Sequence, residues 1–153
     1  MELAPRVGVD FHLTGWSQKA QQAFADQWCG DRHPTSAHWD WHDIYRRHST
    51  EPDRLEMVVW SPDDRLCCLG LALSAGRAIE VRFVEGDPRE GCPLKGRRSL
   101  IVFECAAAYA QGRGKAELRA QPVNARLQSL YRDVYGFNLE KPARGTPYWV
   151  RKV

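Results

Sequence analysis

A run of basic residues precedes a predicted helix in the middle of the chain, in the sequence PLKGRRS. Cationic side chains are disfavoured at a helix N-terminus, because the unpaired N–H groups and the helix dipole make that end positive. A bound anion would remove this cost. We therefore predict a site for a phosphate-bearing ligand, and the alternative is a solvated basic turn. The residues of this predicted site are Lys95, Gly96, Arg97, Arg98 and Ser99.

Aromatic and histidine residues are concentrated between positions 28 and 48, in WCGDRHPTSAHWDWHDIYRRH. Aromatic faces close to carboxylates such as Asp40 and Asp43 bind organic ammonium groups through cation–π contact and charge pairing. We therefore expect a pocket for an amine-bearing molecule. In the alternative interpretation the aromatic residues pack on a sheet and the histidines face water. The candidate pocket residues are Trp28, Trp39, Trp41, His42 and Tyr45.

The same segment contains histidines at a spacing that suits a metal ion. His38 and His42 lie four residues apart, and Asp31 or His33 could add a third ligand. Neither a cysteine pair nor a His-Glu-x-x-His motif accompanies them. We therefore expect a half-exposed histidine face and no metal.

Residues 115–137, KAELRAQPVNARLQSLYRDVYGF, predict a strand followed by a helix. Apolar and polar residues alternate over 116–121, as in a half-buried strand, and Pro122 ends the pattern. Asn124 then caps a helix with apolar residues at positions i, i+3, i+4 and i+7. Gly136 ends this helix. The apolar stripe consists of Leu127, Leu130, Tyr131 and Val134.

The other elements follow from similar patterns. A first strand is predicted at 7–13, a helix from the cap at 14–17 to about 29, and a second helix at 37–47 capped by Ser36. The turn Pro62-Asp63-Asp64 joins strands 55–61 and 65–74 into a hairpin. A strand at 78–85, an apolar helix over 94–110 and two C-terminal strands complete the order. The helix at 94–110 allows strands 78–85 and 116–120 to be parallel, so we expect a mixed sheet.

Composition limits the class of protein. The 153 residues, 43% of them apolar, suit one domain with one core. A net charge of +3 is too small to indicate binding to nucleic acid or an anionic membrane. No apolar run reaches the length of a membrane span, the start has no signal-peptide pattern, and the five cysteines are an odd number. We expect a cytoplasmic protein with free, mostly buried thiols.

This order of elements, together with LYRDVYGF, resembles the GNAT (general N-acetyltransferase-type) superfamily of acyltransferases. The resemblance extends from about residue 55 to the C-terminus, and the first fifty residues match only in their number of helices. It implies a single α/β domain of α+β type over residues 1–153, with a mixed, mostly antiparallel central sheet flanked by helices. It also implies acetyl-CoA as cosubstrate and an amine-bearing small molecule or peptide as acceptor, and it allows a homodimer.

The resemblance assigns roles to individual residues. Tyr131 matches the tyrosine of the family's lYxxxGF run, which protonates the departing thiolate, and Tyr135 is the rival phenol. Glu80 matches the strand carboxylate that takes the amine proton, with Glu85 as second choice. The remaining matches are a backbone N–H near Phe83 or Val84 for the oxyanion, and Asn124 for the pantetheine arm. The alternative for Tyr131 is a core ring, for Glu80 a surface pair with Arg82, and for Asn124 a helix cap only.

The family's pyrophosphate loop reads Gln or Arg, two residues, Gly, one residue, then Gly or Ala. With Gly96 as the central glycine, Pro93 and Arg98 occupy the two other signature positions, so one of three matches. This departure suggests a second function: a catalytically degenerate GNAT-fold module for ligand binding or interaction. A third function is nucleic-acid binding through scattered arginines and tryptophans. The charge pattern argues against it, because acidic residues accompany those basic ones.

Overall fold

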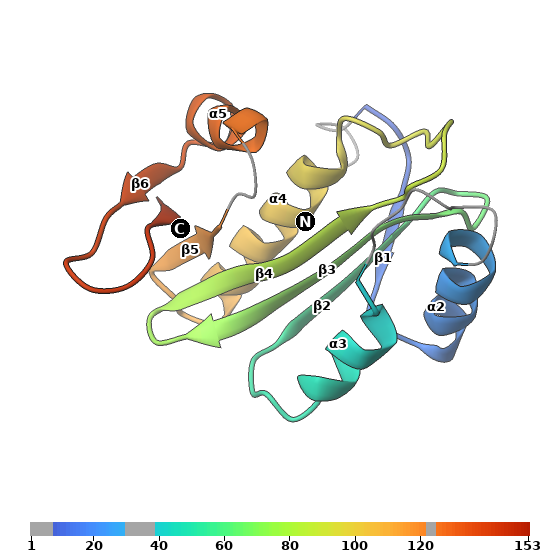
Figure 1. Ribbon diagram of the computed structural model, residues 1–153, viewed down its shortest axis with the longest axis horizontal. Helices are drawn as coiled ribbons and strands as arrows, with labels where there is room; N and C mark the ends of the chain where they lie inside the picture. Colours follow the sequence, from blue (N-terminus) through green and yellow to red (C-terminus); the bar gives the residue numbers. More distant parts are fainter. Residues whose placement is uncertain (1–7, 30–38, 122–124) are drawn as a thin grey trace.

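The computed structural model describes residues 8–29, 39–121 and 125–153 (Figure 1). The elements before the central helix are β1 (His12–Thr14), α2 (Gln18–Ala23), the π-helical η1 (Phe24–Trp28), α3 (Trp41–Arg47), β2 (Leu55–Trp60), β3 (Leu66–Ala75) and β4 (Ala78–Gly86). The remaining elements are α4 (Arg98–Gly112), β5 (Glu117–Ala120), α5 (Ala125–Asp133), β6 (Asn138–Glu140) and β7 (Tyr148–Lys152). The predicted order of elements is confirmed.

These strands form one sheet in the order β1-β2-β3-β4-β5-β7-β6. Neighbouring strands are antiparallel except for β4 and β5, which are parallel and are joined through α4. A parallel pair needs such a crossover, whereas β3 and β4 are joined by a two-residue turn in which Gly76 has a φ of +58°. The predicted mixed, mostly antiparallel sheet is therefore confirmed.

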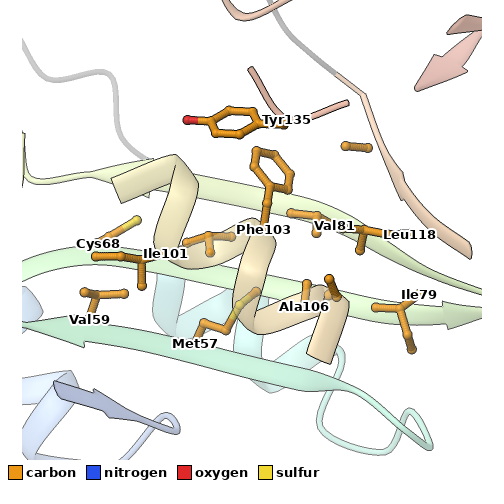
Figure 2. Packing of buried hydrophobic residues seen from close by; sticks show 14 of the residues in the cluster. Met57, Val59, Cys68, Ile79, Val81, Ile101, Phe103, Ala106, Leu118 and Tyr135 are labelled. Carbon is orange, nitrogen blue, oxygen red and sulfur yellow. The ribbon is translucent and has the colours of Figure 1, made fainter. Parts of the chain in front are cut away.

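Helices cover both faces of the sheet. α4 packs on one face through Ile101 and Phe103, which belong to a core with Ile79 and Val81 of β4 (Figure 2). α2, η1 and α3 pack on the opposite face, over Leu69 and the other apolar residues of a second core (Figure 1). None of the helices in the described ranges is long and apolar enough to cross a bilayer.

Several predicted boundaries were wrong. α3 begins at Trp41 with Asp40 as its N-cap, whereas Ser36 and the start predicted at 37 lie outside the described residues. α4 begins at Arg98, because residues 94–97 form turns before it. Val134 does not belong to the buried stripe, since α5 ends at Asp133 and this side chain is 64% exposed. The cysteines are free thiols, as predicted.

Candidate active site

A bulge in β4 lies where this strand separates from β5. Leu71 of β3 pairs with Phe83, but the next residue, Ala72, pairs with Val81, so Arg82 is an additional residue in β4. The parallel pairing with β5 ends at Val81, opposite Ala120. From Phe83 to Gly86, β4 remains paired with β3 while β5 no longer accompanies it. The backbone edge of this part of β4 can therefore form hydrogen bonds with a ligand.

The bulge also changes the face of the sheet on which the side chains of β4 lie. Strict alternation would put Val84 on the face of Glu80, and Phe83 on the opposite face with Val81. In the structure Phe83 packs with the core under α3, and Val84 packs with the core under α4. One additional residue inverts the alternation, because the side-chain period of a strand is two. The side chain of Phe83 therefore faces the α3 layer, on the side opposite to α4.

The N-terminus of α4 lies beyond the end of β4. Its N-cap is Arg97, and no side chain caps the first turn. Two successive turns precede the helix, in which the N–H groups of Lys95 and Arg97 donate to the carbonyls of Cys92 and Leu94. Gly96, with a φ of +86°, lies within the second turn. Lys95, Gly96 and Arg97 are exposed. The first-turn N–H groups, with two cationic side chains beside them, can hold an anion.

Arg98 makes contacts within the protein. Its guanidinium lies against Gly86, where an added methyl group would be 2.4 Å from the Arg98 Cζ atom. It donates a hydrogen bond from Nη1 to the carbonyl of Asp87 at 3.0 Å. These contacts anchor α4 to the end of β4, and the expected contact of Arg98 with a phosphate stays a prediction.

Asp87 holds the loop between β4 and α4. Its side chain is fully buried, and its two carboxylate oxygens accept from Arg65 Nε at 2.7 Å and from Arg89 Nε and Nη2 at 2.9 Å. Burial raises the pKa of Asp87, but the hydrogen bonds from Arg89 and Arg65 outweigh it, so the pKa lies below its ordinary value. This cluster fixes the start of the loop that leads to the α4 N-terminus.

Two tyrosines from the C-terminal end of α5 surround Phe103 of α4. The ring of Tyr131 makes an edge contact with Phe103 at a centroid distance of 4.9 Å, and that of Tyr135 lies at 5.5 Å. Both are buried, and burial raises the pKa of each phenol. For Tyr135, the neighbouring Ser99 in the first turn of α4 offsets part of this rise in pKa. Four residues separate Tyr131 from Gly136, one more than in the lYxxxGF pattern.

On the opposite face, aromatic residues surround the end of β4. Trp39, 42% exposed, makes an edge contact with Phe83 at 5.2 Å. The Oε1 atom of Glu85 accepts from the Trp41 indole at 2.7 Å and from the backbone N–H of Trp39 at 3.1 Å. His48 also contacts Phe83, at 5.9 Å. A carboxylate beside aromatic faces is thus present, although it is Glu85 and not the expected Asp40 and Asp43.

Those two aspartates have other roles. Asp40 caps α3 by accepting from the backbone N–H of Asp43, and Asp43 pairs with Arg46 and Arg47. The pKa of Asp43 is lowered, chiefly by its hydrogen bond from Arg46.

Three of the expected pocket residues are core residues instead. Trp28, Trp41 and Tyr45 are buried in the core between the sheet and its helices. The Trp28 indole donates to the carbonyl of Leu66 at 3.0 Å, and the Tyr45 hydroxyl donates to that of Gly70 at 2.7 Å. Aromatic composition alone could not separate this packing from ligand binding.

The exposed His42 lines a surface pocket of about 390 Å³, together with Trp16, Phe24, Cys29 and three glutamines. This pocket lies between α2, η1 and the start of α3. Sequence analysis did not predict it, because residues far apart in the chain form its walls.

Glu80 lies on the face of Phe83, and its Oε1 atom accepts from Arg82 Nε at 2.8 Å. This is the surface pair that was considered as the alternative to a catalytic role. Asn124, His38, His33 and Asp31 lie outside the described residues. Among the described residues, no three His, Cys, Asp or Glu side chains are grouped as a metal site would require.

Comparisons with known proteins place this geometry in a wider context. Neither a protein-family model nor a curated protein matches the sequence. An acetyltransferase of the GNAT family from Staphylococcus aureus Mu50 matches with a TM-score of 0.65 at 8% identity, over 94% of this chain and 99% of the other. PaiA N-acetyltransferase from Thermoplasma acidophilum, solved with coenzyme A, matches with a TM-score of 0.60 at 13% identity, over 95% and 100%.

A spermidine N-acetyltransferase, SpeG from Vibrio cholerae, matches with a TM-score of 0.61 at 13% identity, over 94% of this chain and 92% of the other. At such low identities the likeness is one of fold. It extends over nearly the whole length of each chain.

Proposed function

We propose, from the premise that this chain has the fold of the GNAT acetyltransferases, that it transfers an acetyl group from acetyl-CoA to a primary amine. One observation carries the proposal: β4 separates from β5 at a bulge, and beyond it lies an uncapped helix N-terminus flanked by Lys95 and Arg97. A free strand edge suits the amides of a pantetheine arm, and the helix N-terminus suits a pyrophosphate.

The reaction begins with attack of a neutral amine nitrogen on the thioester carbonyl carbon. Because a lysine-like amine has a pKa near 10.4, a carboxylate must take its proton, directly or through water. Glu80 and Glu85, both on the α3 face of β4, are the candidates. Glu80 would have to exchange its partner Arg82, whereas Glu85 already lies beside the aromatic residues that suit an ammonium group.

The tetrahedral oxyanion would be met by a backbone N–H near Phe83 or Val84, where the bulge redirects the edge of β4. Collapse of this intermediate breaks the C–S bond and releases a thiolate, which takes a proton from a phenol. The sequence nominates Tyr131 for that step. The products are an N-acetyl amine and coenzyme A.

The direct test is an assay of thiol release from acetyl-CoA with a panel of amines that includes polyamines, amino acids and peptide N-termini. Amine-dependent thiol release, with the acetylated product identified by mass, would support the proposal. Binding of coenzyme A without transfer to any amine would instead favour the degenerate-module function.

Removing the cations at the α4 N-terminus should weaken cofactor binding. We expect Lys95→Gln/Arg97→Gln to raise the Kd for acetyl-CoA on the order of tenfold, because two charge-assisted contacts to phosphate are lost. The dependence of binding on salt should also become less steep. Isothermal titration calorimetry at two salt concentrations measures both.

Arg46→Gln/Arg47→Gln is the matched control, because it removes the same charge from α3 on the opposite face of the sheet. It should leave the Kd within about twofold. Equal weakening in both double variants would mean that only net charge matters, and would contradict a site at the α4 N-terminus.

A further inference from the structure

Beside the opening between β4 and β5, one face of the sheet carries exposed cationic side chains. It is the face of Glu80 and Glu85, the candidates for taking the amine proton. On the basis of the proposed acetyltransferase function, we propose that this surface binds the acidic residues of a peptide or protein acceptor whose N-terminal amine is acetylated. The surface, called the basic sheet face below, consists of Arg77, Arg82, Arg119 and Lys152, with Glu80 and Glu117 between them.

Strand pairing places these side chains on one face. Leu118 of β5 belongs to the core under α4, so its neighbours Glu117 and Arg119 lie on the opposite face of the sheet. Glu80 of β4 is the partner of Arg119. Lys152 of β7 is the partner of Glu117. Since partners in adjacent strands point to the same side, the basic sheet face extends over three strands.

The helices on this face lie over other strands. Among the described residues, the core under α2, η1 and α3 contains residues of β2 and β3 and Phe83 of β4, but none of β5 or β7. Figure 1 shows α2 and α3 apart from β5. The side chains of Arg77 and Lys152 are accordingly 68% and 77% exposed. This part of the sheet is therefore accessible to a partner.

One buried carboxylate holds three of the cations. The side chain of Glu117 is only 5% exposed. Its partners are Arg77 at 2.7 Å, Arg119 at 3.1 Å and Lys152 at 3.3 Å. A single carboxylate does not neutralise three cations, and it lies beneath them. The surface therefore presents positive charge to the solvent, which is complementary to the carboxylates of a partner.

Two arginines of the basic sheet face are held in place. Arg119 donates from Nε to Glu117, and its guanidinium lies over the ring of Tyr148 at 4.7 Å. Arg82 donates from Nε to Glu80 at 2.8 Å. Because a guanidinium has further N–H donors, each of these arginines can also bind a carboxylate of the acceptor. Side chains that are already fixed lose less entropy when they bind.

The two sides of the bulge carry opposite charge. Beyond it, Glu85 accepts from the Trp41 indole, whose ring contacts Phe83 at 6.4 Å. At the bulge the basic sheet face begins with Arg82. An ammonium group is therefore attracted to one side and carboxylates to the other. A peptide with a free N-terminus followed by acidic residues has this polarity, whereas a polyamine is cationic throughout.

The length of the surface favours a peptide over a single amino acid. Ala78, the partner of Glu117, lies four positions before Arg82 in β4. At the rise of a strand this is about 13 Å, the length of about four residues of an extended chain. The cations Arg77 and Lys152 lie at the far end of this distance, because both pair with Glu117. We therefore expect acidic residues directly after the acetylated residue of the acceptor.

Two peptides of equal length test the inference. One begins Ser-Glu-Glu-Glu-Glu and the other Ser-Gln-Gln-Gln-Gln, and the rest of their sequence is the same. We expect kcat/KM for the glutamate peptide to be higher on the order of tenfold, mainly through a lower KM, because the reacting amine is the same in both. This preference should weaken as salt is added. Equal kcat/KM values would overturn the inference.

The double variant Arg77→Gln/Lys152→Gln removes the two most exposed cations of the surface. It should lower kcat/KM for the glutamate peptide on the order of tenfold and leave that for the glutamine peptide within about twofold. Lys19→Gln/Arg113→Gln is the matched control, because it removes two exposed, paired cations from α2 and from the end of α4. Equal losses in both double variants would mean that only net charge matters, and would contradict the proposed surface.

A binding experiment separates failure of this inference from failure of the proposed function. The glutamate peptide, acetylated at its N-terminus and labelled with fluorescein at its C-terminus, has no amine to react, so its fluorescence anisotropy reports binding alone. We expect Arg77→Gln/Lys152→Gln to raise its Kd on the order of tenfold, and the control variant to leave the Kd within about twofold.

The outcomes can be told apart. If the wild-type protein acetylates amines but uses polyamines or free amino acids as efficiently as the glutamate peptide, the acceptor class is wrong and the function stands. If the labelled peptide binds through these cations but no amine is acetylated, the function fails and recognition of acidic residues stands. Tighter binding of a single-stranded RNA than of the labelled peptide would assign the surface to nucleic acid and overturn the inference.

Discussion

Replacing Asp87 with alanine is expected to lower the free energy of unfolding by about 3 kcal/mol, the low end for removal of one partner from a buried ion pair. The carboxylate of Asp87 is fully buried, whereas its partners Arg65 and Arg89 keep 22% and 26% of their side chains exposed. Loss of the carboxylate leaves two guanidinium groups close together with their hydrogen bonds broken. Urea unfolding followed by circular dichroism measures the change.

Asp43→Ala is the control for this prediction. Asp43 also pairs with two arginines, Arg46 and Arg47, but on the exposed surface of α3. We expect a much smaller change than for Asp87→Ala, because exposed ion pairs contribute little to stability. Equal losses in the two variants would show that burial of the Asp87 cluster does not matter.

The effect of Asp87 should depend on pH. Since its pKa is lower in the folded protein than the ordinary value of 3.8, its stabilising contribution is fully present above that value. It is lost as the pH falls through the folded-state pKa. The stability difference between wild type and Asp87→Ala should therefore shrink below about pH 4, and a constant difference down to pH 2 would contradict the ion-pair explanation.

Phe103→Ala should be comparably destabilising, at about 3–5 kcal/mol. Phe103 is 1% exposed and its ring contacts Tyr131, Tyr135 and Phe137, so its loss leaves a cavity between α4 and the end of α5. Both tyrosines would lose the surface that positions them, so turnover should fall as well. Urea unfolding measures the loss of stability, and an assay of thiol release from acetyl-CoA measures the fall in turnover.

Leu139→Ala provides the comparison, because Leu139 is 42% exposed on the edge strand β6. We expect it to cost less than about 1 kcal/mol. A Phe103→Ala variant as stable as Leu139→Ala would mean that the aromatic cluster does not contribute to the core.

The order of elements could be predicted because local signals mark its boundaries. Pro62-Asp63-Asp64 forms the turn between β2 and β3, where Asp64 has a φ of +63°. Ser17 caps α2 through its side chain, as expected from its residue type. Such signals act within a few residues, so a single sequence contains them.

The details of the site depend on contacts between distant residues, and sequence analysis missed them. The bulge at Arg82 is set by how β4 pairs with β3, so alternation along β4 alone placed Phe83 on the wrong face. Arg98 packs onto Gly86, because the glycine leaves room for its guanidinium, and this contact could not be predicted from the sequence. Trp28 and Trp41 are buried whereas Trp39 is exposed, and the residue type alone does not predict this difference.

The proposed function depends on the binding of acetyl-CoA in the opening between β4 and β5 and at the α4 N-terminus. Isothermal titration calorimetry of the purified wild-type protein with acetyl-CoA, at moderate salt and without phosphate in the buffer, tests it most directly. We predict binding of one acetyl-CoA per chain with a Kd in the micromolar range, about −8 kcal/mol, and competition by coenzyme A. The absence of binding at millimolar acetyl-CoA would contradict the proposed cofactor site, and the likeness to acetyltransferases would then be one of fold alone.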